Sequence, residues 1–305
     1  MAFEIRHLRS YVAVAEERHF GRAAERLHIT QPALSRTIQQ LEAELGGPVF
    51  KRSTRTVELT ALGATFLPAA RTAVASFDTA YLKGQMAARG EVATVLLGHT
   101  EVAIFGQLPR ILHTYRGHYP NSTVTLFPGN TRENIARVIS GEIDVALVTG
   151  LTANEELNCE PLWEEGSVVV MAAGHHLAKR RSIELKELAG EPFVMGPSKS
   201  WQAYRPLVEQ ACARMGFSPR IVQEADSSSA LVQLVARDEG ITIHPACIRN
   251  VTPPQVVVRE LIKPLITVQT CLIRRRDNHS KAVVHFWRVA EECCRMPSAK
   301  PGKYA

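Results

Sequence analysis

The first 60 residues alternate apolar and polar positions with the period of an α-helix. In the segment 6–18 the apolar side chains fall largely on one helical face: Leu8, Tyr11, Val12, Val14 and Ala15. The next short segment, "FGRAAERLH", places the small residues Ala23 and Ala24, with Leu27, toward the same interior. Because small residues let neighbouring helices approach closely, the pattern predicts two short helices packed on a third.

That third helix is expected from residue 31 onward. Thr30 precedes it, and a threonine hydroxyl at this position accepts a backbone N–H of the first turn. Pro32 lies in the first turn, where a missing N–H costs nothing. A stripe of leucine and isoleucine then recurs every three or four residues: Leu34, Ile38, Leu41 and Leu45. Gly46 and Gly47 are expected to end the helix.

The opposite face of this helix is polar at its N-terminal end. Such side chains reach base edges and phosphates, and a recognition helix enters the major groove with its N-terminal residues leading. The following stretch "VFKRSTRTVEL" alternates like a β-hairpin and carries basic residues that can contact the phosphate backbone. Taken together, these features predict a winged helix-turn-helix, although a polar helix face or a basic loop alone is usually just solvated. The candidate DNA-binding residues are Gln31, Pro32, Ser35, Arg36, Gln39, Lys51, Arg52 and Arg55.

Residues 60–90 are rich in alanine and read as one long helix. Its apolar residues form a seam with a spacing near three and a half residues: Phe66, Ala70, Ala73, Val74, Phe77, Ala80 and Tyr81. A seam on one side of a long helix needs a partner helix, and a second copy of the chain supplies one. Packing on the chain's own C-terminal region is the alternative. Pro68 predicts a kink or a late start of the regular helix.

After Gly90 the pattern changes to β-branched runs that alternate with helical segments, which is typical of α/β units around largely parallel sheets. Strand, helix, strand, helix occurs twice, around residues 93–150 and 191–245, so we expect two similar lobes. The predicted organisation is a DNA-binding domain at 1–59, a linker helix at 60–90 and a third region at 91–305. Within that region we place lobe I at about 91–162 and 267–295, and lobe II at about 163–266.

Composition and charge narrow the class of protein. The chain has 305 residues, 45% of them hydrophobic and 22% charged, and no stretch approaches the roughly 18 uninterrupted apolar residues of a membrane span. The N-terminus "MAFEIRHLRS" does not have the pattern of a secretory signal, so a cytoplasmic protein is expected. The formal charge of +6 weakly favours a polyanionic partner.

Catalytic and metal-binding patterns are missing from the sequence. We find no GxSxG, HExxH, phosphate-loop or dinucleotide motif and no CxxC pair, so the sequence predicts neither an enzyme nor a cofactor or metal site. "GHH" at 174–176 is interpreted as a loop. Most of the six cysteines are expected to be small buried residues, while Cys212, Cys293 and Cys294 leave a redox-sensing function open. A solute-binding protein would share the bilobal domain but needs an export signal.

Several motifs of this sequence resemble those of a known protein family. The pattern "AA..L..TQPALS..I..LE..LG..VF.R", followed by "LT..G", is similar to the N-terminal domain of LysR-type transcriptional regulators. The later motifs "I.GEIDVALV" and "LV....GI..HP" fit the same family, so the resemblance covers essentially the whole chain, and its N-terminal half looks most like regulators of aromatic-compound degradation. It implies groove-reading residues on the third helix, a basic wing, a dimerising linker helix and a pseudo-palindromic DNA site. It also implies a homo-oligomer, dimer or tetramer, a small-molecule effector, and RNA polymerase as a further partner.

The resemblance also implies a two-lobed effector domain like that of periplasmic binding proteins. In such open α/β sheets, small ligands lie beyond the carboxyl ends of strands and near helix N-termini. The corresponding loops yield the candidate effector-binding residues His99, Thr100, Glu101, Thr131, Arg132, Thr149, Ser198, Lys199, Ser200, Ser227 and Pro245. Thr131, Ser200 and Ser227 are equally well explained as helix N-caps.

Two of these positions bear on the kind of effector. Thr131, with Arg132 beside it, matches the position at which relatives that sense aromatic-degradation intermediates hold a carboxylate. Glu101 departs from those relatives, which carry a small hydroxyl residue there, and its carboxylate repels an acidic ligand nearby. Two hypotheses follow: an organic acid, aromatic or muconate-like, held on the side of Thr131 and Lys199, or a ligand with a donor group facing Glu101 and His99. The sequence does not disclose the effector's identity, the target genes or the direction of regulation.

Overall fold

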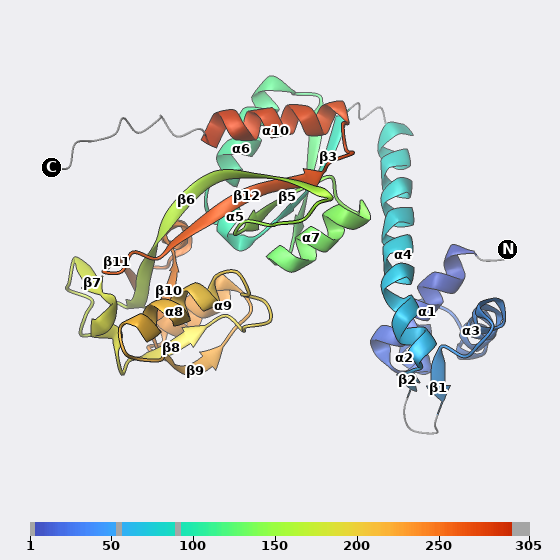
Figure 1. Cartoon of the computed structure of the whole chain (residues 1–305), viewed down its shortest axis with the longest axis horizontal. Coiled ribbons are helices and arrows are strands. Elements are labelled where there is room, and N and C mark those ends of the chain that lie inside the picture. Colours follow the sequence, from blue (N-terminus) through green and yellow to red (C-terminus); the bar gives the residue numbers. More distant parts are fainter. Residues whose placement is uncertain (1–3, 53–56, 89–92, 295–305) are drawn as a thin grey trace. The chain divides into compact units, whose positions relative to one another are not determined.

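The structure is a computed structural model that describes residues 4–52, 57–88 and 93–294. The chain divides into two compact units, one of Met1–Arg89 with Ser140–Glu142 and one of Gly90–Ile139 with Ile143–Ala305. We describe each unit by itself (Figure 1). Across the described ranges, none of the helices combines the length and the apolar character that a bilayer crossing requires.

The first unit is a helical domain with a hairpin. Its elements are α1 (Ile5–Glu17), α2 (Phe20–Arg26), α3 (Gln31–Leu45), β1 (Phe50–Arg52), β2 (Val57–Leu59) and α4 (Ala61–Ala88). The two strands pair antiparallel, with Lys51 opposite Glu58. One core joins the three helices, the hairpin and the start of α4, and its fully buried members include Tyr11, Leu34, Ile38 and Leu41. The predicted winged helix-turn-helix is confirmed.

The ends of α3 follow from its sequence. The hydroxyl of Thr30 accepts a hydrogen bond from Ala33 N at 3.4 Å, and proline occupies the first turn. At the other end Gly46 has a φ of +75°, a conformation that an L side chain rarely adopts. Leu34, Ile38 and Leu41 are buried and Leu45 is half-buried, so the predicted apolar stripe faces the core.

The long helix α4 begins inside the DNA-binding domain. The hydroxyl of Thr60 accepts Gly63 N at 3.0 Å, and the buried hydroxyl of Tyr11 donates to Gly63 O at 2.6 Å. A Cβ at Gly63 would lie 2.2 Å from Val49 O, so only glycine allows this approach. Pro68 lies inside the helix, which starts seven residues earlier at Ala61. The expected late start is therefore wrong: the chain tolerates a proline in the helix because α4 is already packed against the domain on both sides of it.

Part of the predicted seam on α4 is covered by its own domain. Ala70 is buried, and the ring of Phe66 lies 5.5 Å from that of Tyr11. The later seam residues Phe77 and Tyr81 are 45% and 63% exposed. The first turns of the seam thus belong to the domain core, while Phe77 and Tyr81 on its later turns are exposed.

The second unit contains two α/β lobes. Lobe I holds β3 (Ala93–His99), α5 (Glu101–Phe105), α6 (Leu108–His118), β4 (Ser122–Pro128), α7 (Thr131–Ser140), β5 (Val145–Thr149) and α10 (Lys281–Cys294). Strands β4 and β5 both pair parallel with β3. Helices α6 and α10 pack on these strands around a core that includes Leu97, Tyr115 and Phe286.

Lobe II is built from shorter elements. These are β7 (Ser182–Glu184), the 3₁₀ turn η1 (Leu185–Leu188), β8 (Pro192–Met195), α8 (Arg205–Arg214), β9 (Arg220–Glu224), α9 (Ser228–Ala236), β10 (Thr242–Pro245), η2 (Ala246–Val251) and β11 (Val256–Ile262). Strands β8 and β9 are parallel, and Phe193 of β8 bridges in parallel to Ile241 beside β10. Two cores, one around Phe193 and Ile243 and one around Val170 and Leu231, lie on either side of these strands.

Two long strands, β6 (Leu157–Ala172) and β12 (Thr267–Arg275), connect the lobes (Figure 1). β12 pairs antiparallel with β5 and β6, and β6 pairs antiparallel with β10 and β11. The expectation of largely parallel sheets is therefore wrong where the two lobes meet. The chain crosses from lobe I to lobe II along β6 and returns along β12, so these two strands are antiparallel. The predicted lobe border at residues 162–163 falls within β6.

Candidate functional site

The exposed face of α3 carries the polar residues expected to contact DNA. Gln31, Pro32, Arg36 and Gln39 are exposed, and Ser35 is half-buried. All five lie in the first nine residues of the helix, opposite the buried stripe. The face presents amide, hydroxyl and guanidinium groups at a helix N-terminus, the composition that reads base edges in a major groove.

Charge pairing distinguishes Arg36 from several other arginines of this unit. Several arginines form ion pairs with neighbouring carboxylates: Arg9 with Asp78, Arg26 with Glu16 and Glu17, and Arg71 with Glu16. Within the described ranges, Arg36 has no such carboxylate partner. Its charge is therefore available to a polyanion without breaking an internal contact.

The hairpin contributes one described cation. Lys51 is exposed on β1. Arg52 lies in the same strand, but its side chain is outside the described residues, as is the whole of Arg55. The structure thus places Lys51 on the hairpin and leaves the other two basic residues as sequence-based candidates.

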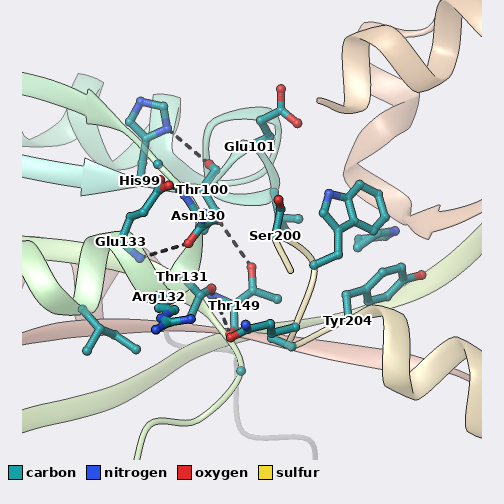
Figure 2. Close-up of a pocket in the computed structure, with 18 of the residues that line it drawn as sticks. His99, Thr100, Glu101, Asn130, Thr131, Arg132, Glu133, Thr149, Ser200 and Tyr204 are labelled. Atoms are coloured by element: carbon teal, nitrogen blue, oxygen red, sulfur yellow. Dashed lines mark hydrogen bonds between the residues drawn. The ribbon is translucent and has the colours of Figure 1, made fainter. Parts of the chain in front are cut away.

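A cavity of about 930 Å³ lies between the lobes of the second unit. Figure 2 shows the labelled side chains of lobe I on one side and those of Ser200 and Tyr204, from lobe II, on the other. The lobe I residues follow the carboxyl ends of β3, β4 and β5, as the sequence predicts for parallel strands. The cavity is large enough for a small organic molecule.

Three threonines hold the lobe I wall together. The hydroxyl of Thr131 accepts Thr149 N at 3.0 Å and lies 3.3 Å from Thr149 O, to which it donates. The hydroxyls of Thr100 and Thr149 lie 3.4 Å apart (Figure 2). Thr100 also caps α5, since its hydroxyl accepts Ala103 N. The Thr131 hydroxyl is thus bonded twice within lobe I, beside the N-terminus of α7.

The lobe II wall contains two aromatic rings, those of the half-buried Trp201 and the buried Tyr204. Trp201 packs on Gly196 so closely that a Cβ there would lie 2.1 Å from the indole ring. The Tyr204 hydroxyl donates to Ser167 Oγ at 2.7 Å, and burial raises the pKa of this phenol well above its usual range. His244 is buried beside both rings, and desolvation lowers its pKa to about 4. His244 is therefore neutral at pH 7.

The hydrogen bonds of His244 define its tautomer. Its Nδ1 lies 3.0 Å from Pro245 O, and a carbonyl only accepts, so Nδ1 carries the proton. Its Nε2 then accepts the hydroxyl proton of Ser228 at 2.9 Å. This bond holds Ser228, the first residue of α9, at the edge of the cavity.

The charged groups of the cavity are mostly acidic. Glu101, Glu133 and Asp226 line it together with one guanidinium, that of Arg132. Glu101 Oε2 accepts Ser228 N at 2.6 Å, which joins lobe I to lobe II. Glu133 accepts Asn130 N at 3.1 Å (Figure 2), and Asp226 accepts the hydroxyl of Ser200. In the described part of the chain, Arg132 forms no ion pair.

Two family models match the chain. The "Bacterial regulatory helix-turn-helix protein, lysR family" matches residues 5–64, and the "LysR substrate binding domain" matches residues 88–295. The second match alone covers more than half of the sequence. The chain belongs to the LysR family of transcriptional regulators.

Relatives cover nearly the full length of this LysR-type regulator. AlsR of Bacillus subtilis (strain 168) is 32% identical over 287 residues, 94% of this chain and 95% of AlsR. The Hca operon transcriptional activator HcaR of Escherichia coli (strain K12) is 30% identical over 289 residues, 95% of this chain and 97% of HcaR. Both relatives are named as regulators of transcription.

Solved structures show the same fold. The crystal structure of CbnR, a LysR family transcriptional regulator, matches with a TM-score of 0.78 at 22% identity and covers 96% of this chain and 100% of CbnR. CbnR has also been solved in complex with its target DNA, and that chain matches with a TM-score of 0.75 at 23% identity, covering 95% of this chain and 100% of that one. The two family matches and the relatives, which are transcriptional regulators and not enzymes, make this chain a DNA-binding transcriptional regulator with an effector-binding domain.

Most of the effector candidates in this LysR-type regulator meet at the cavity. Those that line it are His99, Thr100, Glu101, Thr131, Arg132, Thr149, Ser200 and Pro245. Ser198 and Lys199 are exposed and lie outside the lining. Ser227 also lies outside it and caps α9, since its hydroxyl accepts Ala230 N at 3.1 Å. Of the residues that the organic-acid hypothesis invoked, Thr131 and Arg132 therefore line the cavity, and Lys199 does not.

Several lining residues were not among the candidates. They include Asn130, Glu133, Trp201, Tyr204, Asp226, Ser228 and His244. Most of them lie in the same strand-end loops as the candidates. The sequence pattern therefore identified the loops, but it did not identify these individual side chains. The burial of Tyr204 and His244 depends on packing between distant segments, for which the sequence contains no local signal.

One group of described side chains has the residue types of a metal-binding site. His175, His176 and Glu191 place one ligand atom each within 4.8 Å of one another. Their contacts are hydrogen-bond contacts: His176 Nε2 lies 2.7 Å and His175 Nε2 3.4 Å from the Glu191 carboxylate. Leu177 N also donates to His175 Nδ1 at 3.3 Å, so His175 carries its proton on Nε2. Because these bonds account for the cluster, we assign no metal to it.

Proposed function

We propose that this protein binds a pseudo-palindromic promoter site as a homo-oligomer and changes its DNA contacts when a small organic acid binds between the lobes of its effector domain. The observation that carries the DNA half of this proposal is the exposed polar N-terminal face of α3, where Arg36 has no carboxylate partner among the described residues. The complex of CbnR with its target DNA supports the same use of this domain.

The effector half rests on the cavity between the lobes. Its lobe I side offers the α7 N-terminus and Arg132, which together suit one carboxylate. Its lobe II side offers the flat apolar surfaces of Trp201 and Tyr204, which suit a planar or hydrocarbon body. A ligand that binds one arrangement of the lobes more tightly than another shifts the equilibrium between them, and this is how the signal reaches the DNA.

The assembly follows from α4. Phe77 and Tyr81 are exposed on the later turns of a 28-residue helix, and a second copy of that helix covers them best. Two DNA-binding domains held by such a dimer read two half-sites, and dimers can associate further into a tetramer. In this proposal the protein acts in the cytoplasm on promoter DNA, where RNA polymerase is the further partner.

The redox-sensing alternative has little support among the four buried cysteines. Burial raises the pKa of the thiols of Cys212 and Cys294 to about 11 and that of Cys271 to about 12, and it raises the pKa of Cys247 further. A thiol with so high a pKa is almost entirely protonated at pH 7 and reacts slowly. We therefore favour the ligand-binding function.

Alanine variants of the two proposed kinds of DNA contact test the proposal. We expect Arg36→Ala to weaken binding to a promoter fragment by roughly 10- to 100-fold, and binding to random duplex much less, because a base-edge contact is lost. Ser35→Ala is expected to act in the same direction. Lys51→Ala should weaken both and reduce the slope of log affinity against log salt by about 1, because it contacts phosphate.

Fluorescence anisotropy of labelled DNA measures these affinities over a range of salt concentrations. Arg214→Ala is the matched control, because Arg214 is an exposed arginine at the end of α8 in the other unit. An equal loss on promoter and random DNA for Arg36→Ala would show that this side chain only contacts phosphate. The proposed reading face would then be wrong.

A further inference from the structure

Glu101 spans the cleft of the effector domain. It is the first residue of α5 in lobe I, and its Oε2 accepts the backbone N–H of Ser228, the first residue of α9 in lobe II, at 2.6 Å. The first N–H groups of a helix have no partner inside the helix and lie at the positive end of its dipole. The Glu101 carboxylate therefore occupies the place where this helix would otherwise hold an external anion.

The remaining groups at this end of α9 are also bonded within the protein. Ala230 N donates to Ser227 Oγ at 3.1 Å, and the Ser228 hydroxyl donates to His244 at 2.9 Å. The neutral, buried His244 adds no positive charge. Glu101 Oε1, in contrast, has no hydrogen-bond partner in the described part of the chain. This end of the cleft thus offers a ligand an acceptor with a full negative charge.

Among the described residues, the cleft has one cationic side chain, and a carboxylate follows it in α7: Glu133 comes after Arg132 and accepts Asn130 N. Arg132 is exposed beside the α7 N-terminus, while Glu101, Glu133 and Asp226 are the other charged lining groups. A ligand with one carboxylate can place it near Arg132. A second carboxylate on the same ligand would face Glu101, and like charges in a partly desolvated cleft repel each other strongly.

We propose that Glu101 makes this cleft select a ligand with a single carboxylate and, at the opposite end, an ammonium or other N–H donor: an amino acid in the broad chemical sense, and not a dicarboxylate. The carboxylate lies toward Arg132 and the α7 N-terminus. The ammonium donates to Glu101 Oε1, while Oε2 keeps its bond to Ser228 N. This inference rests on the proposed function, because it assumes that an organic acid binds between the lobes.

Matched pairs of probes test this selection on the full chain by isothermal titration calorimetry at pH 7. Glutarate is compared with 4-aminobutyrate, in which an ammonium replaces one carboxylate, and terephthalate with 4-(aminomethyl)benzoate, in which a protonated aminomethyl group replaces it. We expect the wild-type protein to bind at least one of the two zwitterions, and to bind it at least roughly tenfold more tightly than its matched diacid. Glu101→Gln, which keeps the size and an acceptor oxygen for Ser228 N, should abolish most of that preference, and Glu101→Ser should reverse it.

Glu155→Gln is the control, because Glu155 is an exposed carboxylate outside the cavity lining. It should leave the preference unchanged. Hydrogen exchange at the Ser228 amide gives a readout that needs no ligand: we expect slow exchange in the wild type and Glu155→Gln, and faster exchange in Glu101→Ser. Equal exchange in all three proteins would contradict the bond between the lobes.

The outcomes separate this inference from the proposed function. If the wild type binds a diacid as tightly as its matched zwitterion, or if Glu101→Gln keeps the preference, the inference is overturned while sensing of an organic acid stands. If none of the four probes binds to the wild type or to either Glu101 variant, both the inference and the organic-acid effector are overturned. The DNA-binding half of the proposed function is measured separately and does not depend on either result.

Discussion

At the scale of single residues, buried polar groups in the effector domain make its stability depend on pH. His244 has a pKa of about 4 in the folded protein against an ordinary value of 6.5, because burial disfavours its charged form. As the pH falls below 6.5 the unfolded chain binds a proton that the folded chain does not. Stability is therefore lost between pH 6.5 and pH 4, by up to roughly 3 kcal/mol from this group alone.

A glutamine at this position tests that effect. Its amide oxygen can still accept the Ser228 hydroxyl but does not titrate, so we expect His244→Gln to be less stable than the wild type at pH 7 and to lose less stability on acidification. All three tryptophans, Trp163, Trp201 and Trp287, lie in the effector unit, so their fluorescence during urea unfolding at pH 7 and pH 4.5 reports on it. An equal loss for both proteins would show that His244 does not carry the effect.

Gly98 is a second residue whose identity is set by packing. A Cβ there would lie 2.5 Å from Ile143 Cδ1 and 2.6 Å from Asn134 Oδ1, under the end of β3 that leads into the cleft. We expect Gly98→Ala to destabilise the effector domain by about 1–3 kcal/mol, because the core must shift to admit the methyl group.

The matched control is Gly117→Ala on α6, where a Cβ would meet nothing within 4 Å. There the substitution should raise stability by up to about 1 kcal/mol, because alanine favours the helix. Urea unfolding followed by tryptophan fluorescence measures both changes. Equal effects of the two substitutions would contradict the close packing at Gly98.

The sequence predicted the cleft better than its individual side chains. Thr131 and Glu101 could be found because they follow strands that the apolar pattern made evident. Their actual contacts could not, because the partner of Glu101 lies 127 positions away, on a helix of the other lobe. Lys199 shows the opposite error: it belongs to a correctly identified loop but does not line the cavity, since Trp201 packs there instead.

At the scale of elements, helices with a one-sided apolar stripe were predicted well and crossing strands were not. The pattern of α3 determined both its ends and its buried face. Only the last part of β6 was recognised, because its first half, "LNCEPLWEEG", is polar and contains Pro161. That half is a strand because it pairs with β12, and the pairing shifts register between Thr270 and Cys271, opposite the proline region. Long-range pairing of this kind overrides local propensity.

The exposed turns of α4 give a prediction at the same scale. We expect Tyr81→Asp to weaken self-association by at least roughly tenfold, because it places a charge in the proposed helix seam. Thr72→Asp is the control, since Thr72 is exposed and lies off the seam. Analytical ultracentrifugation over a range of protein concentrations measures both variants. If the two behave alike, the later turns of α4 are not the self-association surface.

At the scale of the whole molecule, each compact unit carries one of the two sites. The described part of the first unit includes the proposed DNA-reading face of α3, and the second contains the cleft, across which Glu101 accepts Ser228 N. Linkage requires that a ligand which raises DNA affinity by some factor is itself bound more tightly, by the same factor, in the presence of that DNA. Gene control by this protein therefore depends on both sites together, and it requires sequence-specific DNA binding first.

The most direct test of that foundation is the affinity of the purified full-length protein for two labelled duplexes of equal length. One is taken from the DNA beside its own gene, and the other has a random sequence. At about 0.15 M salt we predict that the protein binds the first at least ~10³-fold more tightly, as specific regulators do. Equal affinity for the two duplexes would contradict the account at its centre.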